Sequence, residues 1–228
     1  FSPGPITYVL KLKKDTKISK YVNNNQKSLA VRFPKHPLFK SLLKQLDYPL
    51  AAPSANIATK VSAVKKNDVI EEFGNKIKYV LDGGVCEIGI ESTIINLIGK
   101  PTILRLGGLD ISKIQKTLGF KLNLAINPKK IVAPGQSHLH YSPGIPLRMN
   151  VKKPTNDEAF IIIKKRKNKL KNYFYLTFNN NLEEAAKNLY SCLRNIKNKG
   201  FKSIAVEKIP NKGLGKTIND RLKRASCY

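Results

Sequence analysis

Apolar residues along the first half of the chain switch between the spacing of strands and the spacing of helices. Short apolar or alternating runs predict strands at 6–12, 28–33, 77–81, 93–98 and 102–106. Three helices are predicted in the same half: one from Pro37 with an apolar stripe to Leu46, one capped by Asn67, and one between Asp110 and Gly119. Strands and helices mixed in this order favour an α/β domain.

The second half has a different pattern. From about residue 123 to 146 the periodicity fades and Pro, Gly and His accumulate, which indicates a linker. Buried-type strands are then predicted at 159–163, 173–177 and 203–208, with a long amphipathic helix at 182–199 and a last helix at 216–225. A strand, a helix and a strand at this spacing predict a βαβ unit with a parallel sheet. The pattern therefore indicates two α/β domains joined by a linker.

The composition is that of a globular protein. Hydrophobic residues make up 41% of the chain, charged residues make up 25%, and there is no Trp. No stretch approaches the roughly 18 consecutive apolar residues of a membrane-spanning helix, and the first residues do not have the pattern of a signal peptide. The 3 cysteines are far apart, which argues against a disulfide framework or a zinc site and predicts a cytoplasmic location.

The charge balance is strongly basic. Lys and Arg number 42 against 15 Asp and Glu, giving a formal net charge of +27. Such a charge is typical of nucleic-acid-binding proteins. The excess is nearly all Lys, however, and it accompanies abundant Asn and Ile, as A+T-rich codons would produce. Basic residues cluster at 152–153 and 164–169, but no RNA- or DNA-binding motif supports a specific reader.

Several common catalytic motifs are excluded by their spacing. Residues 213–217 resemble the end of a phosphate-binding P-loop, but Pro210 stands where that motif needs its first glycine. His138 and His140 have no acidic or Cys partner in the same loop, so a ligand-contacting linker is favoured over a metal site. The sequence has no nucleophile elbow, zinc-protease motif or dinucleotide-binding fingerprint.

The remaining candidates lie at strand ends and in turn-rich loops. Arg32 and Arg105 end predicted strands, Ser54 and Asn56 lie in a Pro-bounded loop, and 91–93 opens another strand. Strand ends that face one side of a sheet form a natural crevice for a small ligand. Arginines beside small hydroxyl residues suit a carboxylate or phosphate. The residues alone therefore predict only an anionic small molecule as ligand.

These segments resemble, in order, the threonylcarbamoyl-AMP synthase family in its two-domain form. The matching motifs lie at 28–34 (SLAVRFP), 49–56 (PLAAPSAN), 81–84 (LDGG), 89–94 (GIESTI), 104–107 (LRLG), 133–136 (APGQ), 140–143 (HYSP), 213–215 (GLG) and 219–222 (NDRL). The resemblance implies an α/β fold in three parts. A YrdC-like twisted mixed sheet with helices would occupy 1–120, a linker or lid 121–146, and a small Rossmann-like parallel domain 147–228.

The resemblance also implies a reaction. L-threonine, bicarbonate and ATP, the last with Mg²⁺, would give threonylcarbamoyl-AMP and pyrophosphate, with no metal ligand set in the protein and no membrane. A downstream tRNA threonylcarbamoyl transferase complex would then transfer the group to an adenosine of tRNAs that read ANN codons.

The family's binding roles carry over to eight positions, while no catalytic side chain is assigned. The implied L-threonine-binding residues are Arg32, Ala52 and Ser92, and the implied ATP-binding residues are Ser28, Ser54, Ser62, Arg105 and Tyr141. Tyr141 would act as a lid that excludes water. Positioning and charge stabilisation at the α-phosphate would supply most of the rate enhancement.

One departure from the family pattern leaves the activity open. An N-terminal Thr, a Lys/Arg-rich segment and a His that contact both substrates in the family have no counterpart here, so we expect an N-terminally truncated domain with an exposed sheet edge. Three interpretations follow: a synthase, an inactive remnant, or a non-catalytic module that binds RNA nonspecifically through its basic surface.

Overall fold

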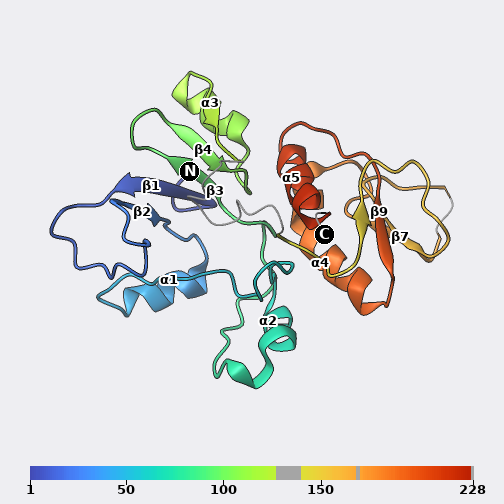
Figure 1. The fold of residues 1–228 in the computed structure, drawn as a ribbon, viewed down its shortest axis with the longest axis horizontal. Helices are drawn as coiled ribbons and strands as arrows, with labels where there is room; N and C mark the ends of the chain where they lie inside the picture. Colours follow the sequence, from blue (N-terminus) through green and yellow to red (C-terminus); the bar gives the residue numbers. More distant parts are fainter. Residues whose placement is uncertain (127–139, 168–169, 227–228) are drawn as a thin grey trace. The chain divides into compact units, whose positions relative to one another are not determined.

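A computed structural model describes residues 1–126, 140–167 and 170–226 (Figure 1). Contacts divide the chain into two compact units, which are considered separately. Unit 1 contains the described residues of Phe1–Pro53 and Glu91–Gln136, and unit 2 contains those of Ser54–Ile90 and Ser137–Tyr228. A middle segment of the first half therefore packs with the second half.

Unit 1 is built on a five-stranded mixed sheet. The strand order is β2-β1-β3-β4-β5. The strands are β1 (Ile6–Lys11), β2 (Ser28–Val31), β3 (Thr93–Asn96), β4 (Thr102–Arg105) and β5 (Asn123–Leu124). Strand β1 is antiparallel to β2 and parallel to β3, β3 is antiparallel to β4, and β4 is parallel to β5. The strands predicted at 6–12, 28–33, 93–98 and 102–106 are present, each ending one or two residues early.

Two helices accompany this sheet. Helix α1 (Pro37–Lys44) begins at the predicted proline and buries none of its residues. Helix α3 (Ile111–Leu118) has the predicted ends, because the Asp110 side chain accepts a hydrogen bond from the Ser112 N–H and Gly119 adopts a φ of 76°. Two apolar residues of α3, Ile111 and Ile114, belong to a buried cluster with residues of the sheet and its connecting loops: Ile6, Ile95, Ile103, Leu106, Leu109 and Leu122.

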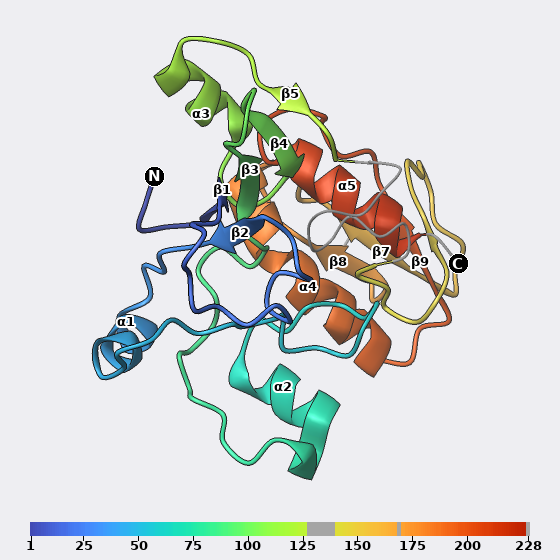
Figure 2. The same ribbon diagram turned by 60° about the vertical axis from the view of Figure 1, so that its left-hand side comes forward.

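Unit 2 contains a wholly parallel four-stranded sheet with the order β6-β9-β7-β8. Strands β9, β7 and β8 are labelled in Figure 2. The strands are β6 (Leu147–Arg148), β7 (Glu158–Ile162), β8 (Tyr173–Tyr175) and β9 (Ser203–Val206). The helices are α2 (Lys66–Phe73), the short 3₁₀ helix η1 (Gly74–Lys76), α4 (Leu182–Asn198) and α5 (Gly215–Ala225). The parallel sheet and the long helix before β9 confirm the βαβ prediction.

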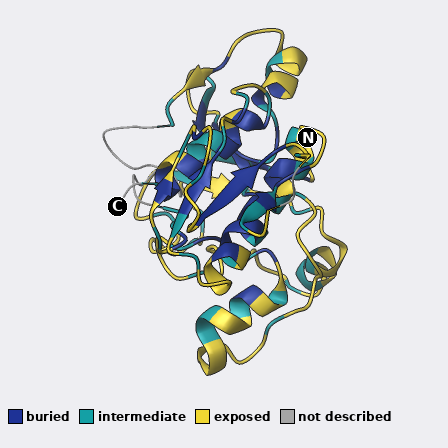
Figure 3. Cartoon of the chain, turned by 90° about the vertical axis from the view of Figure 1, so that its right-hand side faces the viewer, coloured by how far each residue is buried: buried dark blue, intermediate teal, exposed yellow. Residues whose placement is uncertain are grey.

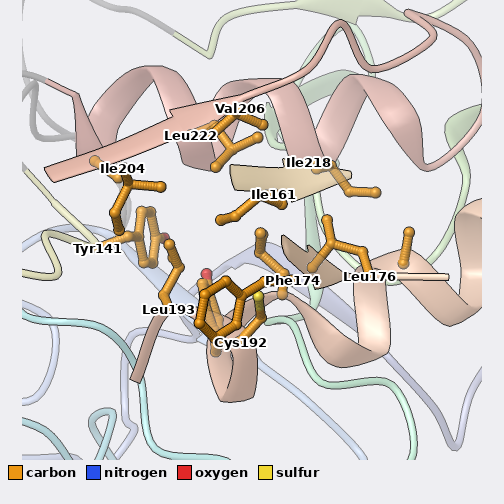
Figure 4. Packing of buried hydrophobic residues seen from close by; sticks show 14 of the residues in the cluster. Tyr141, Ile161, Phe174, Leu176, Cys192, Leu193, Ile204, Val206, Ile218 and Leu222 are labelled. Carbon is orange, nitrogen blue, oxygen red and sulfur yellow. The ribbon is translucent and has the colours of Figure 1, made fainter. Parts of the chain in front are cut away.

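The core of unit 2 follows from the alternation of side chains along the buried strands. All five residues of β7 are buried. Figure 3 colours the chain by burial and shows whole strands in the colour of buried residues. Ala159 and Ile161 belong to the large cluster that includes the apolar residues of α4 and α5, part of which is shown in Figure 4. Phe160 and Ile162 belong to a smaller cluster. Because successive side chains of a strand point to opposite faces, the sheet is covered on both sides.

Two local predictions are wrong. Asn67 does not cap α2, since the helix begins one residue earlier, and the Asp68 carboxylate accepts hydrogen bonds from the N–H groups of Val64 and Lys65. Residues 77–81 form no strand within the part of the chain that the structure describes. Tyr79 is 79% exposed and Leu81 is 60% exposed. Alternation shows that a segment can form a strand, but a strand also needs a neighbour with which to pair.

Within the described ranges, no helix combines the length and the apolar character needed to cross a bilayer.

An ion pair fixes the start of β7. Both carboxylate oxygens of Glu158 accept hydrogen bonds from the Arg148 guanidinium at 2.6 Å, and one also accepts from the Thr155 N–H at 2.8 Å. The hydrogen bonds from Arg148 are the main reason why the pKa of Glu158 falls to about 2. The ionised form of Glu158 is therefore strongly favoured in the folded protein.

We predict that the Glu158 carboxylate makes the free energy of unfolding depend on pH. A carboxyl group with a lowered pKa in the folded state stabilises it above its ordinary pKa, and this stabilisation is lost as the pH falls towards 2. With allowance for the exposed guanidinium, the free energy of unfolding should fall by about 1 kcal/mol more between pH 6 and pH 3 in the wild type than in Glu158→Gln. Urea denaturation at both pH values measures this difference, and equal losses in the two proteins would contradict the prediction.

Candidate functional site

Three of the predicted binding residues lie at one end of the unit 1 sheet. Arg32 follows the end of β2, which is antiparallel to β1. Ser92 precedes the start of β3, which is parallel to β1. Arg105 ends β4, which is antiparallel to β3. The strand directions thus bring residues from three separate sequence motifs to the same end of the sheet.

A compact hydrogen-bonded group connects Arg105, Ser92 and Thr7. The Arg105 guanidinium donates to the Ser92 carbonyl from Nε at 3.1 Å and from Nη2 at 2.9 Å, and Nη2 also lies 3.1 Å from Ser92 Oγ. Ser92 is buried, and its hydroxyl is 2.7 Å from Thr7 Oγ1. The fixed guanidinium places positive charge beside two hydroxyl groups, an arrangement suited to a carboxylate or phosphate.

Arg32 is exposed and has a different anchor. Its Nε donates to the Gly4 carbonyl at 3.0 Å, and the Gly4 N–H donates to the Phe33 carbonyl at the same distance. The arginine is therefore attached to the segment that leads into β1. This bond joins the Arg32 guanidinium to the chain that enters the sheet at the same end.

The two other predicted residues of unit 1 are Ser28 and Ala52. Ser28 is paired with Lys11, at the opposite end of β2 from Arg32. Four residues of extended chain separate Ser28 from Arg32 by roughly 13 Å. Ala52 lies in an exposed loop outside any helix or strand. The binding roles that the family resemblance gives these two residues remain predictions.

The three remaining predicted residues belong to unit 2. Ser54 is exposed, whereas Ser62 is buried. Between them, Asn56 Oδ1 is buried without a hydrogen-bond partner among the described residues, although the amide nitrogen donates to the Ile57 carbonyl at 2.8 Å. An unpaired buried acceptor is costly, so this loop offers an acceptor to a donating group.

Tyr141 lies within the core of unit 2. It is 1% exposed, its ring is stacked on Tyr190 with centroids 5.6 Å apart, and the Arg221 guanidinium carbon is 4.8 Å from its centroid. Figure 4 shows its ring among Leu193 and Ile204. In this arrangement the ring is inaccessible to solvent, and its role as a lid stays a prediction.

Two important side chains were missed by the sequence analysis. Thr7 lies in the middle of an alternating strand, where a hydroxyl gives no separate signal. Arg194 lies on α4 beside the apolar stripe, yet it donates to the Val61 carbonyl at 2.6 Å. Both contacts join residues far apart in the sequence, so no local pattern could have indicated them.

Metal-ligating and thiol side chains are the other groups of the described residues that bear on chemistry. Among them, no group of three or more His, Cys, Asp and Glu side chains could hold a metal ion. Burial raises the pKa of Cys192 to about 12, so its thiol stays protonated at neutral pH.

Comparison with known proteins gives matches along the whole chain. The family model described as telomere recombination matches residues 1–107, and the model described as threonylcarbamoyl-AMP synthase, C-terminal domain, matches residues 109–227. The threonylcarbamoyl-AMP synthase of Pyrococcus abyssi is 33% identical, over 100% of this chain and 72% of that protein. The chain belongs to the threonylcarbamoyl-AMP synthase family.

Other synthases show similar identity and coverage. The threonylcarbamoyl-AMP synthase of Schizosaccharomyces pombe is 30% identical over 99% of this chain and 64% of its own length. That of Bacillus subtilis is 29% identical over 99% of this chain and 70% of its own length. The chain thus spans between 64% and 72% of these three synthases.

Solved structures of the family share the fold. The crystal structure of P. abyssi Sua5 complexed with L-threonine has a TM-score of 0.86 and 31% identity, over 99% of this chain and 71% of that one. A structure of a doubly substituted form of P. abyssi Sua5 has a TM-score of 0.84 and 31% identity, over 99% of this chain and 70% of that one. These matches confirm the predicted α/β class, with one mixed and one parallel sheet.

The backbone at Gly107 lies very close to the backbone of Ser92 and Thr93, at the end of the unit 1 sheet. A Cβ added at Gly107 would lie 2.2 Å from the Ser92 carbonyl carbon and from the Thr93 nitrogen. The N–H of the next residue, Gly108, donates to the Glu91 carbonyl at 2.8 Å. Only glycine therefore permits the segment after β4 to lie against residues 91–93.

We predict that Gly107→Ala destabilises unit 1 strongly, because backbone rather than a flexible side chain must move. The expected loss in the free energy of unfolding is about 3 kcal/mol or more. Gly99→Ala is the matched control: its Cβ would meet nothing within 4 Å, but its φ of +70° disfavours alanine. The control should lose only about 1 kcal/mol in thermal or urea unfolding. Similar losses in both variants would contradict the close-approach argument.

Proposed function

We propose that this chain is an L-threonylcarbamoyladenylate synthase. The amine of L-threonine adds to the carbon of bicarbonate with loss of water, and a carbamate oxygen then attacks the α-phosphorus of ATP. Pyrophosphate leaves, and threonylcarbamoyl-AMP is the product. A downstream tRNA threonylcarbamoyl transferase complex uses this product to modify tRNAs that read ANN codons, and the reaction takes place in the cytoplasm.

The observation that carries the proposal is the family match along all of this sequence, combined with the arginines at the end of the sheet. The relatives named threonylcarbamoyl-AMP synthase match 99% or 100% of this chain. A Sua5 structure with a TM-score of 0.86 was solved as a complex with L-threonine. The fixed group of Arg105, Ser92 and Thr7 supplies the positive charge and hydroxyls that an amino-acid carboxylate or a phosphate requires.

Each side chain then has a role that needs no covalent intermediate. The Arg32 guanidinium binds the L-threonine carboxylate, with the Ala52 backbone and the Ser92 hydroxyl beside it. Arg105 stabilises negative charge on the nucleotide phosphates, while Ser28, Ser54 and Ser62 contact the nucleotide. Mg²⁺ enters with ATP and neutralises phosphate charge. The protein's contribution is to orient the reactants and to place positive charge at the α-phosphate.

We predict that the purified chain releases pyrophosphate only when L-threonine, bicarbonate and ATP are all present. Arg32→Ala should raise the KM for L-threonine roughly 10- to 100-fold, because a charge-assisted hydrogen bond to the carboxylate is lost. The KM for ATP should change much less. Lys35→Ala removes an exposed positive charge three residues away and is the matched control, so its constants should stay near those of the wild type.

The same experiment separates the alternatives. Pyrophosphate release that does not need L-threonine would indicate ATP hydrolysis and would contradict the proposed reaction. A folded chain that releases no pyrophosphate under any condition would support an inactive remnant. Salt-dependent binding of tRNA by such a chain would instead support a non-catalytic RNA-binding module.

A further inference from the structure

The segment from Ser54 to Ile90 lies within the residues matched by the first family model. It nevertheless belongs to the same compact unit as the described residues of Ser137–Tyr228, which the second model covers. Arg194, on α4, connects this segment to the C-terminal part of unit 2 through hydrogen bonds. Its Nη2 donates to the Val61 carbonyl at 2.6 Å and to Glu72 Oε2 at 2.5 Å, and its Nε lies 3.4 Å from the Ser62 carbonyl. One guanidinium thus contacts both the 61–62 backbone and helix α2.

The environment of this guanidinium is largely buried. The Arg194 side chain is 16% exposed, the Glu72 side chain is 9% exposed, and that of Asp68, 3.9 Å away, is 4% exposed. Asp68 in turn accepts hydrogen bonds from the N–H groups of Val64 and Lys65. Buried charges of opposite sign are costly to separate, so the arrangement holds the 61–65 backbone firmly.

Further contacts hold the same segment at both ends. The Ser142 N–H donates to the Thr59 carbonyl at 2.8 Å. At the far end, a Cβ on Gly89 would lie 2.1 Å from the Lys187 carbonyl oxygen, so this backbone lies directly against α4. Val61 and Val64 are also members of the buried cluster that contains the apolar residues of α4. The backbone of the segment is therefore positioned by the C-terminal part of the chain.

We propose that Arg194 is a positioning residue for ATP binding. By holding the Val61 and Ser62 carbonyls, it fixes the loop that carries Ser54 and Ser62, two of the residues that the proposed function assigns to the nucleotide. The affinity for ATP therefore depends on a side chain of the C-terminal domain that does not itself touch the nucleotide. This inference rests on the proposed synthase function, because the nucleotide-binding roles of Ser54 and Ser62 belong to that proposal.

The geometry requires arginine. A guanidinium donates in several directions within one plane, so it can reach a carbonyl and a carboxylate at once. Lysine keeps the positive charge but has a single nitrogen, and it cannot reproduce all of these contacts. Arg194→Lys should therefore have an effect between those of the wild type and Arg194→Ala.

The test compares ATP binding and kinetics in the full chain. Arg194→Ala should raise the Kd for ATP, measured by calorimetry, and the KM for ATP about tenfold or more, while the KM for L-threonine stays within about twofold. Amide hydrogen exchange at residues 57–64 should become faster. Arg166→Ala is the matched control, because Arg166 also pairs with a carboxylate of unit 2, that of Glu207 just after β9. The Kd for ATP, both KM values and the amide exchange should stay near wild type.

Glu72→Gln provides a second variant if Arg194→Ala does not fold. It removes the charge of the Arg194 partner and keeps an acceptor oxygen for the Ile57 N–H, which donates to Glu72 Oε1 at 2.9 Å. The Kd for ATP should therefore rise less than in Arg194→Lys. A wild-type chain that releases pyrophosphate, with Arg194 variants that bind ATP as well as it does, would overturn the positioning role and leave the synthase function standing. Equal increases in both KM values would also overturn it, because a general loss of structure would explain them. A wild-type chain that neither binds ATP nor releases pyrophosphate would overturn both proposals.

Discussion

The structure of unit 2 depends on one packing interaction. Apolar residues of the segment Ser54–Ile90 are buried against helix α4. Val61, Val64 and Ile90 belong to one buried cluster with residues of α4 and α5. Each such side chain contributes about 1.5–3 kcal/mol when fully buried. Burial of this segment also takes its backbone away from water, so its carbonyls need partners. Arg194 supplies one, which is why an arginine rather than an apolar residue lies at this point.

Much of the fold could be predicted from the sequence, because buried parallel strands are continuous apolar runs and amphipathic helices have a clear period. The strand at 77–81 could not be judged in this way, because its alternation says nothing about whether a neighbouring strand exists. The return of residues 54–90 to the second core was also invisible. Local periodicity shows which face of an element is apolar, but it does not show which other segment covers that face.

The candidate site was partly predictable for a related reason. Arg32 and Arg105 lie at strand ends in the sequence, and the strand directions then bring them to one end of the sheet. Ser28 is the first residue of its strand, so the strand direction places it at the opposite end of the sheet. Thr7 and Arg194 have no local signature, since their importance lies in contacts with residues 85 and 133 positions away. Such contacts become visible only when the partner is known.

The excess of positive charge is compatible with this fold because arginine and lysine have different roles. In unit 2, each of the carboxylates Asp68, Glu72, Glu158, Glu207 and Asp220 lies within 4 Å of an arginine. Arg221 and Arg224 are themselves buried, at 1% and 5% exposure, and both pair with Asp220. Removing one partner of a buried pair costs about 3–5 kcal/mol, because the other charge is left without compensation. Exposed lysines carry no such penalty, so a compositional drift towards lysine can raise the net charge while the few acidic residues and their arginines stay tightly constrained.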